Sequence, residues 1–394
     1  MGFLSLPNKK STMLKILIAP NAFKGSLTAL EATSAIAGGF RKSKLPCELI
    51  EVPVADGGDG SLEVIAEHLG ATLMTARVNN PVGAVIDARY GFIEEEKVAI
   101  IEMAEASGIR LIKKEQLNPW RLTSYGAGQL MLQAVTQGAK HIYLTLGGSA
   151  TVDGAIGLLD ALGVVFVNAR GVKMERINMS NLHEVTHLEA NSALQLLAEV
   201  KLTILSDVTN PLLGENGAAS VFGPQKGLQE KDITSMDRLL KHLARLIFEV
   251  NGVAIDTVQG GGAAGGIAAT LFGLFDATII SGGEQILTWS QFDKKLETAD
   301  LVITAEGKID AQTAYGKGPG LVALKAKERG VPVIGICGSV NADQLEVENF
   351  DAIFPITHSP VELAEALTFT PQNIERTACQ IGNLLSATGF LKKS

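Results

Sequence analysis

The sequence is poor in aromatic residues and cysteines, and it has no long uninterrupted apolar run. Aromatic side chains make up 5% of the 394 residues whereas glycine contributes 42, a balance that favours aliphatic parallel sheets with tight turns over an aromatic-rich β-sandwich. The cysteines, Cys47, Cys337 and Cys379, are odd in number and far apart, which indicates reduced thiols rather than disulfides or a metal site. Because no apolar run reaches about 18 residues, we expect no membrane span.

Positive charge is also scarce. Lysine and arginine total 34 against 42 aspartates and glutamates, which gives a net charge of −8. A chain this acidic should not bind nucleic acid non-specifically, so an anionic ligand needs a local cluster of donors. Residues 1–12 lack the basic start and apolar core of a signal peptide, which predicts a cytoplasmic protein.

Both ends of the chain alternate between strand and helix patterns. Thr28 and Glu31 have the spacing of a capping box, and Gly70 follows a second helical run as an expected left-handed cap. We expect these strands to share one parallel sheet of roughly five strands. The predicted strands are 14–20, 48–56, 299–307, 331–338 and 351–357.

The middle of the chain carries strands and helices of its own. Strands are predicted at 141–148 and 201–207, with a helix over 124–137. The fold class is therefore α/β with two α/β domains: an outer discontinuous domain of residues 13–75 plus 285–394, and an inserted domain of residues 76–284. Two consecutive domains divided near residue 190 are the alternative.

Loops that combine glycine with an acid recur after the predicted strands. Open α/β sheets bind ligands at the carboxyl ends of their strands, so these loops are where a site is expected. A single such acid is usually a turn or cap residue, but six of them at strand ends indicate a site, although they specify its chemistry only weakly. Phosphoryl transfer is one chemistry that needs such acids, because carboxylates hold Mg²⁺ and orient a hydroxyl. The six acids are Asp56, Asp59, Asp153, Asp207, Glu306 and Asp310, and the lysines near such loops are Lys24, Lys226, Lys308 and Lys317.

The sequence does not support three common motifs: a dinucleotide-binding GxGxxG, a Walker phosphate loop and a GxSxG nucleophile elbow. Gly260, Gly262 and Gly265 form a GxGxxG, but the preceding segment is a poor strand and no acid is well placed for a dinucleotide. Close helix packing or a phosphate loop of another type is favoured there. No Walker sequence surrounds Gly316–Lys317, and no serine occupies a GxSxG elbow.

The blocks resemble, in order, those of the type-1 bacterial glycerate kinase family. The SDVTNPLLG…GPQKG stretch (206–227) is the most specific, being long and unlike any generic nucleotide motif. The other matching blocks are IAPNAFKGSLTALEA (18–32), VPVADGGDGS (52–61), LTSYGAGQL (122–130), LGGSATVDGAIGLLDALG (146–163), GGGAAGG (260–266) and ADLVITAEGKIDAQTAYGKGP (299–319). Mild departures occur at Asp59, Ser61, Val152, Ala305 and Lys308, and the one at Val152 removes a possible polar contact.

The resemblance implies a Rossmann- or flavodoxin-like outer domain, a second α/β domain and an active site in the cleft between them. It also implies ATP- and Mg²⁺-dependent phosphorylation of D-glycerate, usually to 2-phosphoglycerate. Asp207 is our first candidate for the base or orienting carboxylate, with Asp310 next and Lys24 as a further catalytic residue. Asp56 and Glu306 are the candidate Mg²⁺ ligands. The expected substrate- and nucleotide-binding residues are Asn21, Ser26, Asp56, Asp59, Gly147, Gly148, Ser149, Asp153, Asn210, Gly262, Gly265, Glu306 and Lys317.

Two other functions share this scaffold. A nicotinamide-dependent hydroxy-acid oxidoreductase would bind NADH, and a non-catalytic small-anion-binding protein would need neither the acids nor magnesium. We expect D-glycerate as the substrate, no nucleic acid or membrane partner, and a monomer or homodimer.

Overall fold

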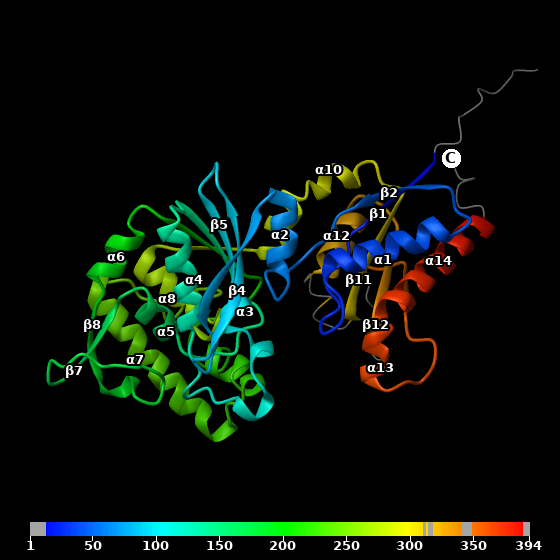
Figure 1. Cartoon of the computed structure of the whole chain (residues 1–394). Helices are drawn as coiled ribbons and strands as arrows, with labels where there is room; N and C mark the ends of the chain where they lie inside the picture. The colour runs from blue at the N-terminus through cyan, green and yellow to red at the C-terminus, as the bar shows by residue number, and fades with distance from the viewer. Residues whose placement is uncertain (1–12, 310–312, 314–317, 341–348, 389–394) are drawn as a thin grey trace, which may run out of the picture. The chain divides into compact units, whose positions relative to one another are not determined.

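The computed structural model describes residues 13–309, 313, 318–340 and 349–388. The chain divides into two compact units, Met1–Ala55 with Ile286–Ser394 and Asp56–Gln285, and each is described by itself (Figure 1). The sequence placed residues 56–75 in the outer domain, whereas helix α2 (Ser61–Leu69) packs against strands of the second unit. The domain bounds that we inferred from the sequence, residues 13–75 plus 285–394 and residues 76–284, stay a prediction.

The first unit contains a sheet of five parallel strands. Their order across the sheet is β13-β12-β11-β1-β2. Numbered one to five along the chain, the strands lie in the order 2-1-3-4-5, which is the flavodoxin-like arrangement. The expected α/β architecture with a parallel sheet is therefore confirmed. The strands are β1 (Leu14–Ile18), β2 (Cys47–Glu51), β11 (Leu301–Ile309), β12 (Val333–Val340) and β13 (Ala352–Pro355).

Helices cover both faces of this sheet. Ile16 and Ile303 pack on the side of α1 and α14, which run next to each other in Figure 1, whereas Leu17 and Val302 pack on the opposite side with Phe292 and Val322. Alternate residues of a strand face opposite sides, so two-sided burial explains the continuous aliphatic runs. The helices are α1 (Ala29–Lys42), α9 (Gly282–Trp289, which begins in the second unit), α10 (Phe292–Leu296), α12 (Pro319–Glu328), α13 (Leu363–Thr368) and α14 (Thr370–Thr388).

Local signals fixed the first turns of the chain as expected. The Glu31 N–H donates to Thr28 Oγ1 at 3.2 Å and the Thr28 N–H donates to Glu31 Oε2 at 2.9 Å, which completes the capping box of α1. The second predicted strand, 48–56, ends earlier, at Glu51. Val52 and Val54 still donate their N–H groups to the neighbouring β1 segment, so the pairing continues past Glu51. Pro53 between them is tolerated because β2 is an edge strand and position 53 faces away from β1.

The second unit is built on a mixed sheet of six strands in the order β10-β9-β6-β5-β4-β3. Strands β10, β9, β6 and β5 are parallel, and β4 and β3 continue the sheet antiparallel. The strands are β3 (Thr72–Asn79), β4 (Val85–Ile93), β5 (Val98–Glu102), β6 (His141–Thr145), β9 (Lys201–Leu205) and β10 (Thr278–Ile280), and a separate hairpin pairs β7 (Val165–Asn168) with β8 (Val185–Glu189).

One large apolar core holds this unit together. It includes Ile101 and Ile142 from the sheet, Leu158 and Leu243 from helices, and Phe166 from the hairpin. The α-helices around it are α3 (Met103–Ser107), α4 (Tyr125–Thr136), α5 (Ile156–Ala161), α6 (Asn191–Leu197), α7 (Ile233–Asn251) and α8 (Ile267–Phe275). Shorter turns are η1 (Ile109–Leu111), η2 (Lys114–Gln116), η3 (Leu182–Glu184), η4 (Ala218–Phe222), η5 (Pro224–Lys226), η6 (Glu230–Asp232) and η7 (Ala263–Gly265).

Within the described ranges, no helix combines the length and the apolar character needed to cross a membrane.

Candidate active site

In the first unit, two predicted residues lie on adjacent parallel strands or just after them. Asn21 follows β1, and Glu306 lies in the last part of β11. Strand β1 leads to Asn21, and the Asn21 N–H donates to the carbonyl of Ala305 in β11 at 2.8 Å. In chain-order numbering these are strands one and three, between which the winding of a flavodoxin-like sheet reverses. That reversal is the topological switch point at which such sheets bind ligands.

The loop after β1 is held by one local hydrogen bond and by one to a segment distant in the sequence. Asn21 is almost fully buried, and its Oδ1 accepts from the Ala22 N–H at 2.7 Å. The hydroxyl of Ser26 donates to the carbonyl of Leu367 at 2.7 Å, which ties the loop to α13. Lys24 lies between these two anchors and is exposed. Of the three, Lys24 is therefore the side chain presented to solvent.

Glu306 is half-buried near the end of β11. Its Oε1 accepts from the hydroxyl of Thr313, and its carboxylate helps raise the pKa of the fully buried Cys337 thiol to about 12, mainly an effect of burial. Two predicted residues, Asp310 and Lys317, lie outside the described residues.

In the second unit, the loop carrying Asp56 and Asp59 makes close contacts with two other loops. The Gly147 N–H donates to the carbonyl of Gly57 at 3.1 Å, and a Cβ on Gly147 would come within 2.2 Å of Gly58 Cα. A Cβ on Gly57 would meet the carbonyl oxygen of Leu205 at 2.8 Å. Only glycine allows the backbones to approach this closely. The ends of β6 and β9 are therefore brought against the Asp56 loop.

Asp207 lies at the centre of this convergence. Its Oδ1 accepts from the hydroxyl of Ser281 at 2.6 Å and its Oδ2 accepts from the N–H of Gly283 at 3.1 Å, both just after β10. Burial raises the pKa of Asp207, and the negative charge of Asp56 raises it further, although the hydrogen bonds from Ser281 and Gly283 oppose the change. Asp56 and Asp207 are thus close enough to interact electrostatically, and Asp56 Oδ1 meanwhile accepts from the Gly58 N–H at 3.0 Å.

An acid that the sequence analysis missed, Glu102, lies beneath the Asp56–Asp59 loop. Its side chain is 1% exposed, and its two oxygens accept from the N–H groups of Gly60 at 3.0 and 3.1 Å and of Leu62 at 2.9 Å, at the start of α2. Burial raises the pKa of Glu102 to about 7, and the nearby charge of Asp59 acts in the same direction. The signal in the sequence is an aliphatic run, 98–101, that ends in this acid.

Arg110 joins Asp59 to the same group of charges. Its Nη1 lies 3.1 Å from Asp59 Oδ1, and its Nη2 lies 2.7 Å from Glu105 Oε1 and 3.9 Å from Glu102 Oε1. These attractions raise the pKa of the half-exposed guanidinium, although burial opposes them. Asp59 is therefore held by an ion pair to a basic residue that sequence analysis did not single out.

The turn at 147–149, whose residues we expected to bind substrate or nucleotide, is backed by a buried lysine. Gly148 is exposed, whereas Ser149 is 6% exposed. The ammonium group of Lys226 donates to Ser149 Oγ at 2.8 Å and to the carbonyl of Thr151 at 2.7 Å, and the residue is 3% exposed. Lys226 is therefore not a solvated surface charge.

Asp153 is fully buried at the start of α5. Its Oδ2 accepts from both the backbone N–H and the hydroxyl of Ser124 at 2.8 Å, and the Leu158 N–H donates to the same hydroxyl at 2.9 Å. Burial raises the pKa of Asp153, although these hydrogen bonds oppose the change. The observed contacts of Asp153 join α4 to α5, and its side chain has no exposed surface.

The GGGAAGG segment is also buried and has no strand before it. A Cβ on Gly262 would lie 2.4 Å from the carbonyl oxygen of Pro211, and one on Gly265 would lie 2.4 Å from that of Thr151. This geometry corresponds to close packing between loops rather than to a dinucleotide fingerprint. Asn210, at the edge of the same contact, donates through Nδ2 to the carbonyl of Asn216 at 2.9 Å.

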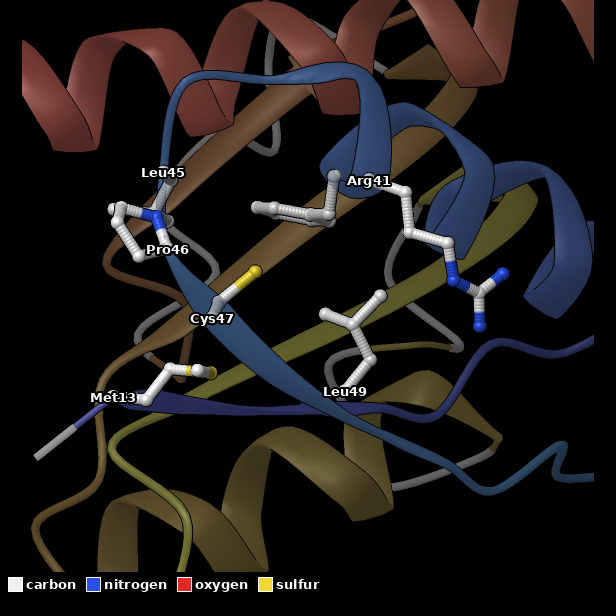
Figure 2. A pocket seen from close by; sticks show the side chains of 7 residues that line it. Met13, Arg41, Leu45, Pro46, Cys47 and Leu49 are labelled. Carbon is white, nitrogen blue, oxygen red and sulfur yellow. The ribbon is translucent and has the colours of Figure 1, made fainter.

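A separate hollow of about 390 Å³ lies at the amino ends of β1 and β2. Figure 2 shows the sulfur of Cys47 pointing toward its middle and the guanidinium of Arg41 turning away from it. None of the predicted site residues lines it, so we do not include it in the candidate site. Its lining residues are Met13, Phe40, Arg41, Leu45, Pro46, Cys47 and Leu49.

Comparisons with known proteins agree with the likeness noted in the sequence. Residues 16–386 match the model of the glycerate kinase family. The chain is 39% identical to a glycerate kinase of Bacillus cereus over 93% of this chain and 97% of that protein, and 38% identical to glycerate 2-kinase of Escherichia coli K12 over 95% and 98%. A crystal structure of putative glycerate kinase 2 from Salmonella typhimurium LT2 superposes with a TM-score of 0.81 at 37% identity, covering 96% of this chain and 99% of that one. This chain belongs to the glycerate kinase family.

Proposed function

We propose that this chain transfers a phosphoryl group from ATP to D-glycerate in the presence of Mg²⁺ and yields 2-phosphoglycerate. The observation that carries the proposal is the convergence of the Asp56 loop with the strand end that leads to Asp207 and with the glycine turn that begins at Gly147. Phosphoryl transfer needs carboxylates at the reacting centre and backbone amides near the phosphates, and it is catalysed mainly by positioning and electrostatics.

Asp207 is the proposed base or orienting carboxylate for the glycerate hydroxyl. Ser281 and Gly283 fix the direction of its two oxygens. Its raised pKa makes the carboxylate a better proton acceptor than an ordinary aspartate, because a group with a higher pKa holds a proton more readily. The hydroxyl proton would pass to a carboxylate oxygen of Asp207 as the hydroxyl oxygen bonds to the γ-phosphorus and the bond to ADP breaks.

Mg²⁺ is usually held by one or two protein carboxylates together with substrate phosphates and water. Asp56 fits that requirement, since its carboxylate lies in a loop held against the glycine turn that begins at Gly147. Among the described residues there is no group of three or more His, Cys, Asp or Glu side chains arranged to hold a metal ion. When bound, Mg²⁺ would neutralise the phosphate charge; Glu306 in the first unit is the other proposed ligand.

The first unit contributes the proposed contacts of its switch point. Lys24 is exposed between the anchored residues Asn21 and Ser26, and it is the candidate for the glycerate carboxylate or the transferred phosphate. The expected cleft location of the site, the monomeric or homodimeric state and the cytoplasmic location all stay predictions.

The reaction itself is the first test. Purified protein is incubated with ATP, Mg²⁺ and D-glycerate, and ³¹P NMR identifies the product; we expect a 2-phosphoglycerate signal that EDTA abolishes and added Mg²⁺ restores. An NADH fluorescence titration serves as the control for the oxidoreductase alternative, and we expect no binding. ATP consumption that does not depend on glycerate, or no phosphorylated product, would contradict the proposal.

The role of Asp207 is tested by Asp207→Asn, which keeps the side-chain shape and removes the charge. We expect turnover to fall by about 10²- to 10⁴-fold, the usual contribution of a positioned acid or base. Asp256→Asn, at an exposed position of the same unit, is the matched control and should leave turnover unchanged. An Asp207→Asn enzyme with near-normal kcat would remove Asp207 from the catalytic role.

A further inference from the structure

The lysine beneath the glycine turn is the feature that the proposed function has not used. Lys226 comes from the η5 turn, more than 70 residues after Ser149 in the chain, yet its ammonium group ends under residues 149–151. Lysine is almost never fully buried unless it is paired, because removing its charge from water is costly. A lysine that is 3% exposed therefore requires a specific role for its position.

The hydrogen-bond direction determines what Ser149 can do. An ammonium group has only donors, so Ser149 Oγ must accept from Lys226. The serine proton is then directed away from Lys226 and is available to another acceptor. The Lys226 bond to the Thr151 carbonyl fixes the ammonium group from a second direction.

The backbone around Ser149 is also held in place. Gly148 accepts from the Ile109 N–H at 2.8 Å, and the Ala150 N–H donates to the Ser107 carbonyl at 2.9 Å. The hydroxyls of Ser107 and Thr151 are buried and have no hydrogen-bond partner within the described part of the chain. The turn thus combines a rigid backbone, a buried cation and hydroxyl groups with unused bonding capacity, as expected of a site for an anionic oxygen.

We propose that Lys226 is a positioning residue that orients the Ser149 hydroxyl toward an anionic oxygen of the substrate, either a phosphate of the nucleotide or the carboxylate of glycerate. This inference rests on the proposed function, since it assigns part of the substrate binding of the same reaction.

The electrostatic surroundings of Lys226 are consistent with that role. Burial lowers the pKa of Lys226 to about 7, and the carboxylate of Asp153 opposes this change. An anion bound at Ser149 would act in the same direction as Asp153 and favour the charged ammonium.

A double-mutant cycle tests the inference. Lys226→Met keeps the chain length and apolar stem but removes the ammonium group, and Ser149→Ala removes the hydroxyl. A hydrogen bond to a charged partner stabilises by about 1.5–3 kcal/mol, so each variant should raise one KM by about 10- to 150-fold while changing kcat less. The double variant should raise that KM no more than the larger single effect, because Lys226 acts through Ser149.

The two substrates are the two arms of this experiment. A higher KM for ATP, matched by weaker binding of a non-hydrolysable ATP analogue in calorimetry, identifies a phosphate; a higher KM for glycerate alone identifies the carboxylate. Lys241→Met, at an exposed position on α7, is the matched control and should change neither KM. If Lys226→Met fails to fold, Lys226→Gln, which keeps an N–H donor, replaces it and should raise the same KM by a smaller factor.

The outcomes separate this inference from the proposed function. A wild-type protein without glycerate kinase activity contradicts the proposed function itself. An active wild type with an unchanged KM in Ser149→Ala, or losses that add in the double variant, leaves that function standing and overturns the role of Lys226. If Lys226→Met and Ser149→Ala lower the free energy of unfolding by equal amounts and leave both KM values unchanged, the lysine only supports the fold.

Discussion

Replacing Glu102 by glutamine should change how the stability of the second unit depends on pH. The folded-state pKa of Glu102 is about 7 against an ordinary value of 4.5. The folded state therefore holds a proton that the unfolded state has lost between these two pH values, so the wild-type free energy of unfolding falls as pH rises from 4.5 to 7. The difference of about 2.5 units corresponds to about 3 kcal/mol at 1.36 kcal/mol per unit.

Glu102→Gln removes this titration but also changes the hydrogen bonds. The glutamine amide supplies one oxygen where the carboxylate supplies two, so the N–H groups of Gly60 and Leu62 compete for it. A buried donor left without a partner costs about 1–3 kcal/mol, and this cost does not depend on pH. The variant should therefore be less stable than the wild type at pH 5 and should recover by about 2 kcal/mol relative to it by pH 7.5, because this range covers most but not all of the titration.

Urea unfolding at pH 5, 6 and 7.5 measures this shift. The chain has two tryptophans, Trp120 in the second unit and Trp289 in the first, so a Trp289→Phe background lets fluorescence follow the second unit alone. Glu67→Gln, at an exposed acid on helix α2, whose first turn donates to Glu102, is the control and should give the same curve as the background at each pH. A stability difference between Glu102→Gln and wild type that stays constant from pH 5 to 7.5 would refute the reasoning.

Three further predictions concern packing and thiol exposure. Gly147→Ala places a Cβ within 2.2 Å of Gly58 Cα, so the Asp56 loop must move. We expect a stability loss of about 1–3 kcal/mol in urea unfolding and a lower kcat. Unchanged kcat and stability would contradict this. Ser124→Ala removes both the donor to Asp153 and the acceptor for the Leu158 N–H, and should lower the free energy of unfolding by about 1–3 kcal/mol while leaving the KM values unchanged. Cys337 is fully buried with a pKa of about 12, so thiol titration at pH 8 should find it unreactive until the protein is unfolded in guanidinium.

Local patterns were sufficient to predict the main strands and helices of the first unit. Its strands are short aliphatic runs with both faces buried, and its helices begin at recognisable caps such as that formed by Thr28 and Glu31. The strand order was not readable from those patterns, because pairing between β1 and β11 joins segments almost 300 residues apart. The flavodoxin-like order came instead from the family likeness, and the sheet confirms it.

The second unit was harder to predict, because its sheet changes direction. The antiparallel pair β3 and β4 alternates exposed residues with partly or fully buried ones over part of its length, in a segment for which we predicted no strand. We assigned α2 to the outer domain because it follows a β-α rhythm, yet it packs on the far side of the division, against β4 and β5. Sequence periodicity indicates which face of an element is buried, but it does not indicate which partner buries it.

The candidate site shows the same limit for individual residues. Asp56 and Asp207 were selected because each is an acid at the end of a predicted strand, but those strands lie in different sheets, β2 in the five-stranded one and β9 in the six-stranded one. The close approach of Gly57 to Leu205, which brings the Asp56 loop to the end of β9, could not be predicted from strand ends. The same rule selected Asp153 and Gly265, but sequence position does not report burial. Both residues are buried, and their observed contacts are with protein groups. Strand-end position therefore finds the layer in which a site lies, whereas burial separates the residues that face a ligand from those that support them.

The supporting residues themselves follow a common physical logic in the second unit. Glu102 lies beneath the acidic loop and accepts from the backbone N–H groups of Gly60 and Leu62, which fixes the end of the loop at the start of α2. Lys226 lies beneath the glycine turn and presents the opposite charge to it. The hydrogen bond from Gly147 to Gly57 couples the two loops, so movement of either should disturb both Asp56 and the turn that we propose binds an anion. Buried charges of opposite sign under adjacent loops are costly for stability, and the expected compensation is that each loop is held in a binding-competent geometry before substrate arrives.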